Sequence, residues 1–389
     1  MIITETKELK KLCRQWLKEP FITVDTEFLR ERTYYSKVCL IQIGSGKGAW
    51  CVDPLAVGID LTPLFEVMRA PKVLKVFHAS FQDLEIFYHL MHEVPAPVFD
   101  TQIAAMMCGF TYQIGYADLV YALTGQNVDK GMRFTDWSQR PLTEQQQQYA
   151  LGDVTHLVPV YLALTEKLKA SGRFEWLEDE WKRLESPSLY QVLPQEVWKK
   201  HRPPSKKPAL VGVYAHLLAW REEMAQKLDK PRRLILSDEI IDALTLGHPT
   251  TPEDLSLLRG MKGLKEEYQT QLLHVIGQAL KEDGKGFESE EEILTPTQKN
   301  LVHLLGVLLG CQAEEVGIAE SLIADKEKLK AFVLSPTRRV FKGWRQEVFG
   351  RKALSFIKGQ LSLSWDGEKG CCQFNQRGQD ADKKTKKDA

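Results

Sequence analysis

The sequence predicts an α/β domain built on a mixed sheet, followed by two all-α helical domains. Short apolar runs near the start form a hairpin and then alternate with helical segments, which is typical of an α/β sheet. Beyond residue 209, apolar residues recur at helical spacing alone, and two stretches of changed composition separate the parts. The expected domains are 1–175 (α/β), 176–209 (basic, Pro-rich linker), 210–282 (helical), 283–294 (linker), 295–365 (helical) and 366–389 (disordered polar tail).

The α/β part begins with a helix over 5–18, where Leu9, Leu12 and Cys13 share one face. The apolar run 21–25 follows a proline and reads as a strand. Residues 38–43 and 49–52 predict two further strands, and the Gly-rich stretch between them predicts a hairpin turn. The remaining expected elements are a helix over 61–69, a strand over 73–77, and helices over 81–92, 101–108, 116–123 and 143–169.

The first linker is recognised by its composition. Residues 186–208 hold five of the 18 prolines, and lysine and arginine greatly outnumber acidic residues there. Proline pairs continue neither a helix nor a strand, so the segment is either a solvated tether or an extended wrap whose cations contact phosphates.

Helix boundaries are visible in the C-terminal half. Asp238 is a plausible helix start, and Thr251 is a plausible N-cap for a helix with Pro252 at its first position. Gly317 and the Ser335–Pro336 pair predict breaks in the last helical segment.

Composition excludes several classes of protein. With 43% apolar and 27% charged residues, and no apolar run near the roughly 20 residues of a membrane helix, a membrane protein is not expected. The 52 basic and 52 acidic residues remove the argument from overall charge for nucleic-acid binding. The first residues show no secretory signal, which would be a basic region followed by an apolar stretch, so we expect a cytoplasmic protein. The seven cysteines include no C-x-x-C pair, so we expect neither a disulfide framework nor a zinc site.

Two carboxylates in the first strand are the strongest sign of chemistry. Asp25 and Glu27 are two residues apart, so in a strand they point to the same face. Their mutual repulsion in an apolar setting favours a bound cation, and divalent cations such as Mg²⁺ prefer oxygen ligands. An acidic pair at an exposed strand end is the alternative.

Two further segments add candidate groups. Asp83 follows the predicted strand 73–77, and it could equally complete a capping box with Ser80 as N-cap. Tyr149 and Asp153 are four residues apart and share one helix face, where a tyrosine hydroxyl could orient a water molecule beside a carboxylate.

Three segments resemble, in order and spacing, the three motifs of the tyrosine subclass of the DEDD superfamily of 3′→5′ exonucleases. They are V-D-T-E-F at 24–28, H-A-S-x-x-D-L-E at 78–85 and Y-A-L-G-D at 149–153. The segments 26–35, 99–103 and 135–143 resemble the bacterial ribonuclease D family more closely. Leu218-Ala-Trp-Arg-Glu222 looks like an HRDC domain, and residues 341–345 fit that family's second helical module. The resemblance covers about residues 1–365 and implies a ribonuclease H-like exonuclease domain followed by two HRDC-like domains.

The resemblance implies a catalytic site and a reaction. Asp25, Glu27, Asp83 and Asp153 would hold two Mg²⁺ ions, with Mn²⁺ also suited to an all-oxygen site, and Tyr149 would orient the attacking water. The implied activity is 3′→5′ exoribonuclease action, releasing nucleoside 5′-monophosphates and trimming the 3′ ends of tRNA precursors and other stable RNAs.

Six residues around this site are candidate substrate contacts. Phe28 and Leu29 could stack on the terminal bases or pack in the core, and His78 and Gln42 could bind the terminal sugar or phosphate or be structural. Trp137 and Arg140 could belong to a loop over the substrate, or form a buried Trp with a structural Arg pair.

Two other functions stay open from the residues alone. No residue identifies a contact to the 2′-OH, so a DNA 3′→5′ exonuclease of the same chemistry is an alternative. A nucleic-acid-binding scaffold is the other, although it predicts a missing carboxylate and all four are present. No obligate protein partner is indicated, and we expect a monomer.

Overall fold

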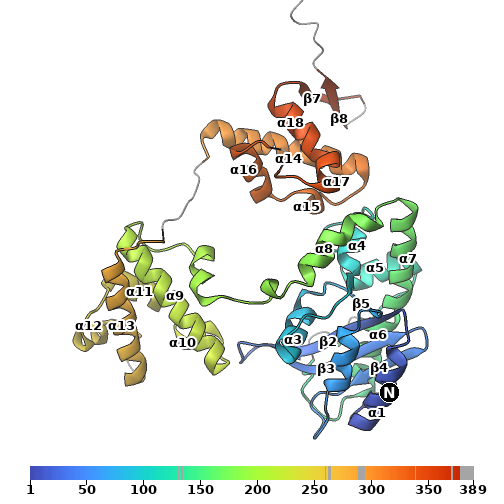
Figure 1. Cartoon of the computed structure of the whole chain (residues 1–389), viewed down its shortest axis with the longest axis horizontal. Helices are drawn as coiled ribbons and strands as arrows, with labels where there is room; N and C mark the ends of the chain where they lie inside the picture. Colours follow the sequence, from blue (N-terminus) through green and yellow to red (C-terminus); the bar gives the residue numbers. More distant parts are fainter. Residues whose placement is uncertain are drawn as a thin grey trace, which may run out of the picture.

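The computed structural model describes residues 1–129, 131–132, 135–258, 260–261, 264–287, 294–337, 339–368 and 371–376. The N-terminal unit is built on a six-stranded sheet in the order β1-β4-β3-β2-β5-β6 (Figure 1). β2, β3 and β4 pair antiparallel, while β1–β4, β2–β5 and β5–β6 pair parallel, so the sheet is mixed as the sequence predicts. The strands are β1 (Ile2–Ile3), β2 (Phe21–Leu29), β3 (Lys37–Ser45), β4 (Gly48–Val52), β5 (Leu74–Phe77) and β6 (Val98–Asp100).

Helices cover this sheet. They are α1 (Thr6–Trp16), α2 (Thr62–Arg69), α3 (Phe81–Met91), α4 (Thr101–Met107), α5 (Tyr116–Thr124), α6 (Glu144–Thr155) and α7 (Leu157–Ala170). The predicted helix over 143–169 is wrong in one respect, because it is two helices that meet at His156. Pro159, in the first turn of α7, has no backbone N–H to donate to a carbonyl oxygen at the end of α6. This favours a break between the two helices at His156.

The short strands β1 and β6 were not expected from the sequence. Each has two or three residues, too few to show an apolar alternation. β6 matters for the site, because it ends at Asp100 beside the end of β5.

The predicted basic linker is a structured wrap and not a solvated tether. It forms α8 (Glu178–Leu184) and three short helical turns at Phe174–Leu177, Pro187–Leu189 and Pro194–Lys200. Leu184 and Tyr190 are buried in the core of the α/β unit, and Val197 is buried in the core of the next unit. Apolar residues spaced among the prolines therefore tie this segment to both domains.

The first helical unit has its own apolar core around Leu217, Leu244 and Leu272, all fully buried. Helix starts at Asp238 and Pro252 are confirmed, and the Thr251 hydroxyl accepts a bond from the Asp254 amide. The helices are α9 (Pro208–Leu228), α10 (Arg232–Ile235), α11 (Asp238–Gly247), α12 (Pro252–Leu257) and α13 (Glu266–Glu282).

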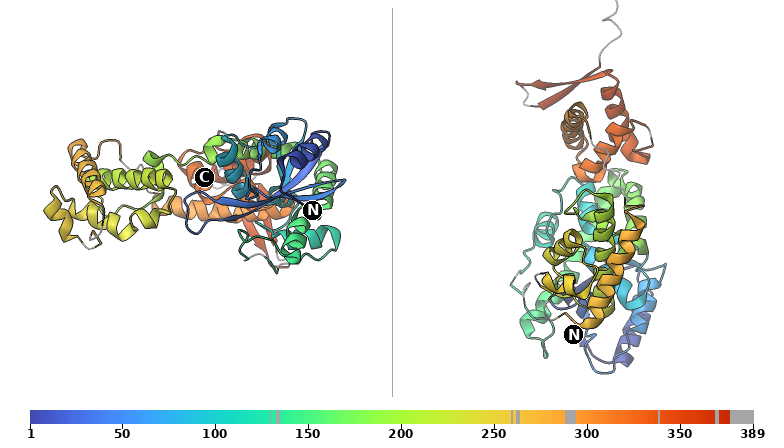
Figure 2. Two further views of the ribbon diagram at one scale, coloured as in Figure 1. Left: turned by 90° about the horizontal axis from the view of Figure 1, so that it is seen from below. Right: turned by 90° about the vertical axis from the view of Figure 1, so that its left-hand side faces the viewer.

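The second helical unit packs directly on the α/β unit, and the two share one apolar core (Figures 1 and 2). The rings of Trp176 and Trp344 stack with centroids 5.1 Å apart, and the Arg345 guanidinium pairs with Glu180. The predicted breaks at Gly317 and Ser335 are confirmed. Its helices are α14 (Pro296–Val316), α15 (Glu320–Ile323), α16 (Lys326–Leu334), α17 (Gly343–Arg345), a π-helical turn (Gln346–Gly350) and α18 (Arg351–Ile357).

The expected disordered tail is wrong at its start. β7 (Leu361–Asp366) pairs antiparallel with β8 (Cys371–Gln376), so the C-terminal unit is not purely helical. Residues 377–389, also expected to be disordered, lie outside the described residues, as do 288–293 of the second linker. No helix in the described ranges is long and apolar enough to span a membrane.

Candidate active site

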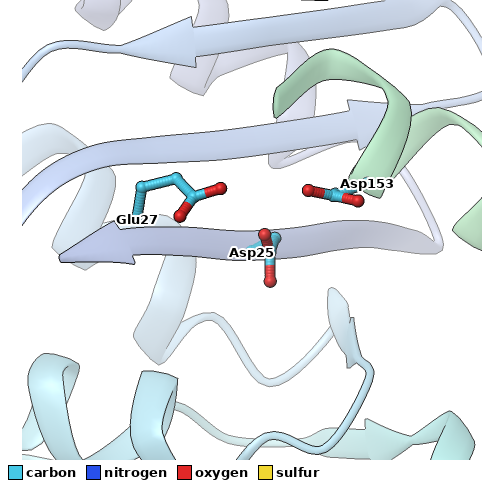
Figure 3. A group of neighbouring side chains, drawn as sticks. All are labelled: Asp25, Glu27 and Asp153. Carbon is cyan, nitrogen blue, oxygen red and sulfur yellow. The ribbon is translucent and has the colours of Figure 1, made fainter. Parts of the chain in front are cut away.

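Three carboxylates meet where β2 passes beneath α6. Asp25 and Glu27 lie two residues apart on β2, opposite Gln42 and Leu40 of β3, and so share a face of the sheet. Asp153 of α6 approaches from above that face (Figure 3). One oxygen from each of these three carboxylates lies within 4.8 Å of the others.

α6 is held over this face by close contacts. The Thr23 hydroxyl donates to the carbonyl oxygen of Val154 over 2.8 Å, and Gly44 of β3 lies directly beneath the same residue. A side chain at Gly44 would press into α6, so glycine there permits the approach that delivers Asp153. Thr143 caps α6 through the reciprocal capping box with Gln146.

Asp83 stands in the first turn of α3, just after the end of β5. It is 6% exposed and accepts a hydrogen bond of 2.5 Å from the Thr26 hydroxyl. The capping-box alternative is wrong, because Ser80 forms no side-chain cap and its hydroxyl donates to Asp100 over 2.8 Å. Asp83 lies outside the three-carboxylate group and yet its charge acts on both Asp25 and Glu27.

Burial raises the pKa of every one of these carboxyl groups, and repulsion from neighbouring carboxylates adds to it for Asp25, Glu27 and Asp83. Desolvation raises the pKa of Asp25 and Asp83 well above the ordinary range, and each also feels a neighbouring aspartate. The pKa of Glu27 rises to about 10 and that of Asp153 to about 7, both mainly through burial. Raised pKa values mean that the four acids do not all ionise readily at neutral pH. A nearby positive charge would favour their ionised, carboxylate forms.

The donor set fits a divalent cation. It consists of carboxylate oxygens alone, which hard cations such as Mg²⁺ and Mn²⁺ prefer. A cavity of about 640 Å³ opens beside the cluster, and among its lining residues in the described part of the chain none is lysine or arginine. A cation is therefore the group that balances this charge.

Tyr149 lines the cavity with Asp153, one helical turn away on the same face of α6. Its ring lies 6.0 Å from that of Trp137, centroid to centroid. The spacing expected from the sequence thus brings a phenol and a carboxylate of the cluster to one cavity.

Sequence reasoning missed Tyr116 and Ala79, which also line the cavity. The Tyr116 hydroxyl donates to the carbonyl oxygen of Asp153 over 2.6 Å and so fixes the backbone that carries this carboxylate. Ala79 has φ of 55°, a strained value for a residue with a Cβ, and its amide donates to Asp100 over 3.2 Å. No pattern in the sequence marks either residue, since both roles depend on tertiary contacts.

His78 reaches the cavity as a candidate substrate contact. Its Nδ1 lies 3.0 Å from the Thr101 hydroxyl, and its Nε2 is buried on the side of the Ile114 backbone. Burial lowers the pKa of His78, which favours the neutral ring. Phe28 and Leu29 lie half-buried at the end of β2, directly after a register shift that follows Glu27.

Of the six predicted contacts, His78 alone is among the described residues that line the cavity. Gln42 has no exposed surface, and its amide has no hydrogen-bond partner among the described residues. Trp137 is 2% exposed, and Arg140 pairs with the buried carboxylate of Asp53 over 2.6 Å. A substrate loop formed by Trp137 and Arg140 is therefore wrong, and the structural alternative holds; Arg133, from the same segment, lies outside the described residues.

Comparisons with known proteins agree with this geometry. Residues 1–169 match the 3′-5′ exonuclease family model, and residues 211–276 match the HRDC domain model. The chain is 40% identical to ribonuclease D of Nitrobacter hamburgensis over 93% of its own length and 96% of that protein. It is also 40% identical to ribonuclease D of Gluconacetobacter diazotrophicus, over 94% and 95% of the two chains.

A solved structure gives the same assignment. The crystal structure of Escherichia coli RNase D, described as an exoribonuclease involved in structured RNA processing, superposes with a TM-score of 0.76. It covers 92% of this chain and 98% of that one at 27% identity. On this fold, these motifs and these relatives, the chain belongs to the ribonuclease D family of 3′→5′ exoribonucleases.

Proposed function

We propose that the enzyme hydrolyses the terminal phosphodiester of RNA 3′ ends with two Mg²⁺ ions and releases nucleoside 5′-monophosphates. The observation that carries this proposal is the cluster of Asp25, Glu27 and Asp153, with Asp83 beside it, in an acid-lined cavity. These four carboxylates would hold the cations. When bound, such ions lower the pKa of the attacking water and stabilise the leaving 3′ oxygen.

The chain's own groups perform the remaining tasks. Tyr149 lines the cavity beside Asp153, and its hydroxyl would orient the attacking water. Tyr116 keeps Asp153 in place through the backbone. The neutral His78 lines the cavity and would contact a sugar hydroxyl or phosphate of the terminal nucleotide. Phe28 and Leu29, at the end of β2, would contact the terminal bases.

The relatives suggest the biological substrate. The Escherichia coli enzyme is described as acting in structured RNA processing, and trimming of tRNA precursors and other stable RNAs by a monomer is our proposal for this chain. A DNA exonuclease of the same chemistry is the competing function, because none of the cavity residues identifies a 2′-OH contact.

The test follows a 5′-labelled RNA with a single-stranded 3′ tail, beside the same sequence as DNA. Wild type and Asp153→Asn are incubated with Mg²⁺ or with EDTA. We expect a ladder that shortens from the 3′ end on RNA with Mg²⁺ and wild type only. A ladder on DNA alone would overturn the RNA assignment, and tight binding without any ladder would favour the scaffold alternative.

A further inference from the structure

The acidic cavity cannot by itself hold the rest of an RNA chain. Its described lining includes five acidic residues, and cations at the metal site would balance charge only around the terminal phosphodiester. Phosphates further along the chain need positive groups elsewhere, because backbone neutralisation supplies most of the affinity for nucleic acids. The chain as a whole is neutral, so those groups must be local. The lining residues that carry a carboxyl group are Asp25, Glu27, Asp118, Asp129 and Asp153.

A second cavity lies at the junction of the α/β unit and the first helical unit. The loop between β2 and β3, which follows Leu29, extends from the sheet toward α10 (Figure 1). Residues 30–34 of this loop and residues 231–234 enclose about 870 Å³, which we call the junction cavity.

Arginines dominate this cavity. Arg30, Arg32, Arg232 and Arg233 line it, and among its described lining residues the one acidic side chain is Glu31. Arg30 pairs with Glu85 over 2.9 Å and Arg232 pairs with a buried glutamate, both of which lie outside the lining. In the part of the chain that the structure describes, Arg32 and Arg233 are exposed and take part in no ion pair.

The walls of the junction cavity are held in place by a buried network. Glu222 of α9 is 1% exposed and accepts hydrogen bonds from the Tyr34 hydroxyl and from Arg232. Asp229, at the end of α9, accepts the backbone amides of Tyr34 and Tyr35 over 3.0 and 2.9 Å. These bonds join the two domains and fix the arginines without using Arg32 or Arg233.

The junction cavity lies within reach of an RNA chain whose 3′ end is at the carboxylate cluster. Arg30 and Arg32 follow Glu27 by three and five residues, which a fully extended chain would span in at most about 10 to 17 Å, and the bend at residues 31 and 32 shortens this distance. Stacked nucleotides rise about 3.4 Å each, so phosphates within about five nucleotides of the 3′ end can reach these arginines.

We propose that the junction cavity binds backbone phosphates of the RNA substrate within about five nucleotides of its 3′ end. The inference rests on the function proposed above, since it takes the terminal nucleotide to lie at the carboxylate cluster. The first helical unit then acts as one wall of the substrate channel.

The experiment compares a dinucleotide with a 12-nucleotide RNA of the same 3′ sequence, because only the longer one reaches the junction cavity. The variants are Arg32→Gln, Arg233→Gln and the double variant, with Arg32→Lys to retain charge. Arg14→Gln removes an equally exposed arginine from α1 and serves as the matched control. The readout is the ratio of kcat/KM on the two substrates and its dependence on salt.

For the double variant we expect the ratio to fall about tenfold and the slope of log(kcat/KM) against log[salt] on the longer RNA to shrink by about 1.4. Arg32→Lys should retain most of the wild-type ratio, and Arg14→Gln all of it. An unchanged ratio and slope, with the metal-dependent ladder intact, would overturn the junction site and leave the proposed function standing.

Failure of the proposed function gives a different result. If wild type shows no metal-dependent shortening from the 3′ end, the anisotropy of the labelled 12-mer is measured in EDTA. Weaker binding by the double variant, with an unchanged Arg14→Gln, would support the cavity as an RNA site. Equal binding by all variants would overturn it.

Discussion

Replacing Asp153 by asparagine should stabilise the metal-free enzyme while abolishing its activity. The carboxyl group of Asp153 is half-buried beside two others, and partial loss of water raises its pKa from 3.8 to about 7. Such a rise disfavours the ionised folded state by about 4 kcal/mol. Water entry and side-chain movement reduce this cost, so we expect Asp153→Asn to raise the free energy of unfolding in EDTA by about 1 to 3 kcal/mol at pH 8.

The sign of the pH dependence follows from the same shift. A group whose pKa is raised by folding costs nothing below its unfolded pKa, because it is protonated in both states. The cost grows as pH rises from about 4 and is complete above the folded pKa of about 7. The stability advantage of Asp153→Asn should therefore be less than half of its full size at pH 5 and largest above pH 8.

Urea unfolding in EDTA, followed by tryptophan fluorescence between pH 5 and 8.5, measures this advantage. Mg²⁺ should reverse the order, because an ion at 100 times its dissociation constant stabilises the wild type by about 2.7 kcal/mol. A variant that is equally stable or less stable than wild type in EDTA at pH 8 would refute the reasoning.

Three further variants test parts of the architecture. Gly44→Ala places a Cβ 2.3 Å from a threonine hydroxyl of β2 and 2.8 Å from a carbonyl oxygen of α6, so kcat should fall at least about tenfold. The control Gly46→Ala adds its Cβ in open space and should leave kcat unchanged. Equal kcat values for the two variants would contradict this prediction. Tyr34→Phe removes a donor from the buried glutamate at the domain junction and should cost about 1 to 2 kcal/mol in urea unfolding, and no loss would argue against the network. Arg140→Leu leaves the carboxylate of Asp53 buried without its ion-pair partner and should lower the free energy of unfolding by about 3 kcal/mol. Mg²⁺ should still raise the melting temperature of this variant. Loss of that Mg²⁺ effect would indicate that Arg140 belongs to the active site.

Much of the site was predictable because it rests on local rules. The two-residue spacing of Asp25 and Glu27 fixes a shared face in any strand, and the four-residue spacing of Tyr149 and Asp153 does so in any helix. Asp83 could be assigned only through its resemblance to a known motif, since the first turn of a helix is an ordinary place for a carboxylate.

The errors have a common cause in long-range contacts. Arg140 was expected over the substrate because its partner, Asp53, lies 87 residues away in sequence and is not visible from either residue's neighbours. The junction cavity is hidden for the same reason, since it joins residues 30–34 to 231–234. The hairpin of β7 and β8 carries only half of the usual signal, since Leu361, Leu363 and Trp365 alternate with polar residues in β7 but β8 shows no such alternation.

Metal rescue at the scissile phosphate tests most directly whether the carboxylate cluster holds the ions that act on the substrate. Sulfur replaces one non-bridging oxygen of the 3′-terminal phosphodiester, and single-turnover rates are measured with Mg²⁺ and with the more sulfur-tolerant Mn²⁺. The account predicts a large loss of rate with Mg²⁺ in one sulfur stereoisomer and recovery with Mn²⁺ in wild type, and no recovery in Asp25→Asn. A rate that is insensitive to sulfur, or an Asp25→Asn variant as active as wild type, would contradict it.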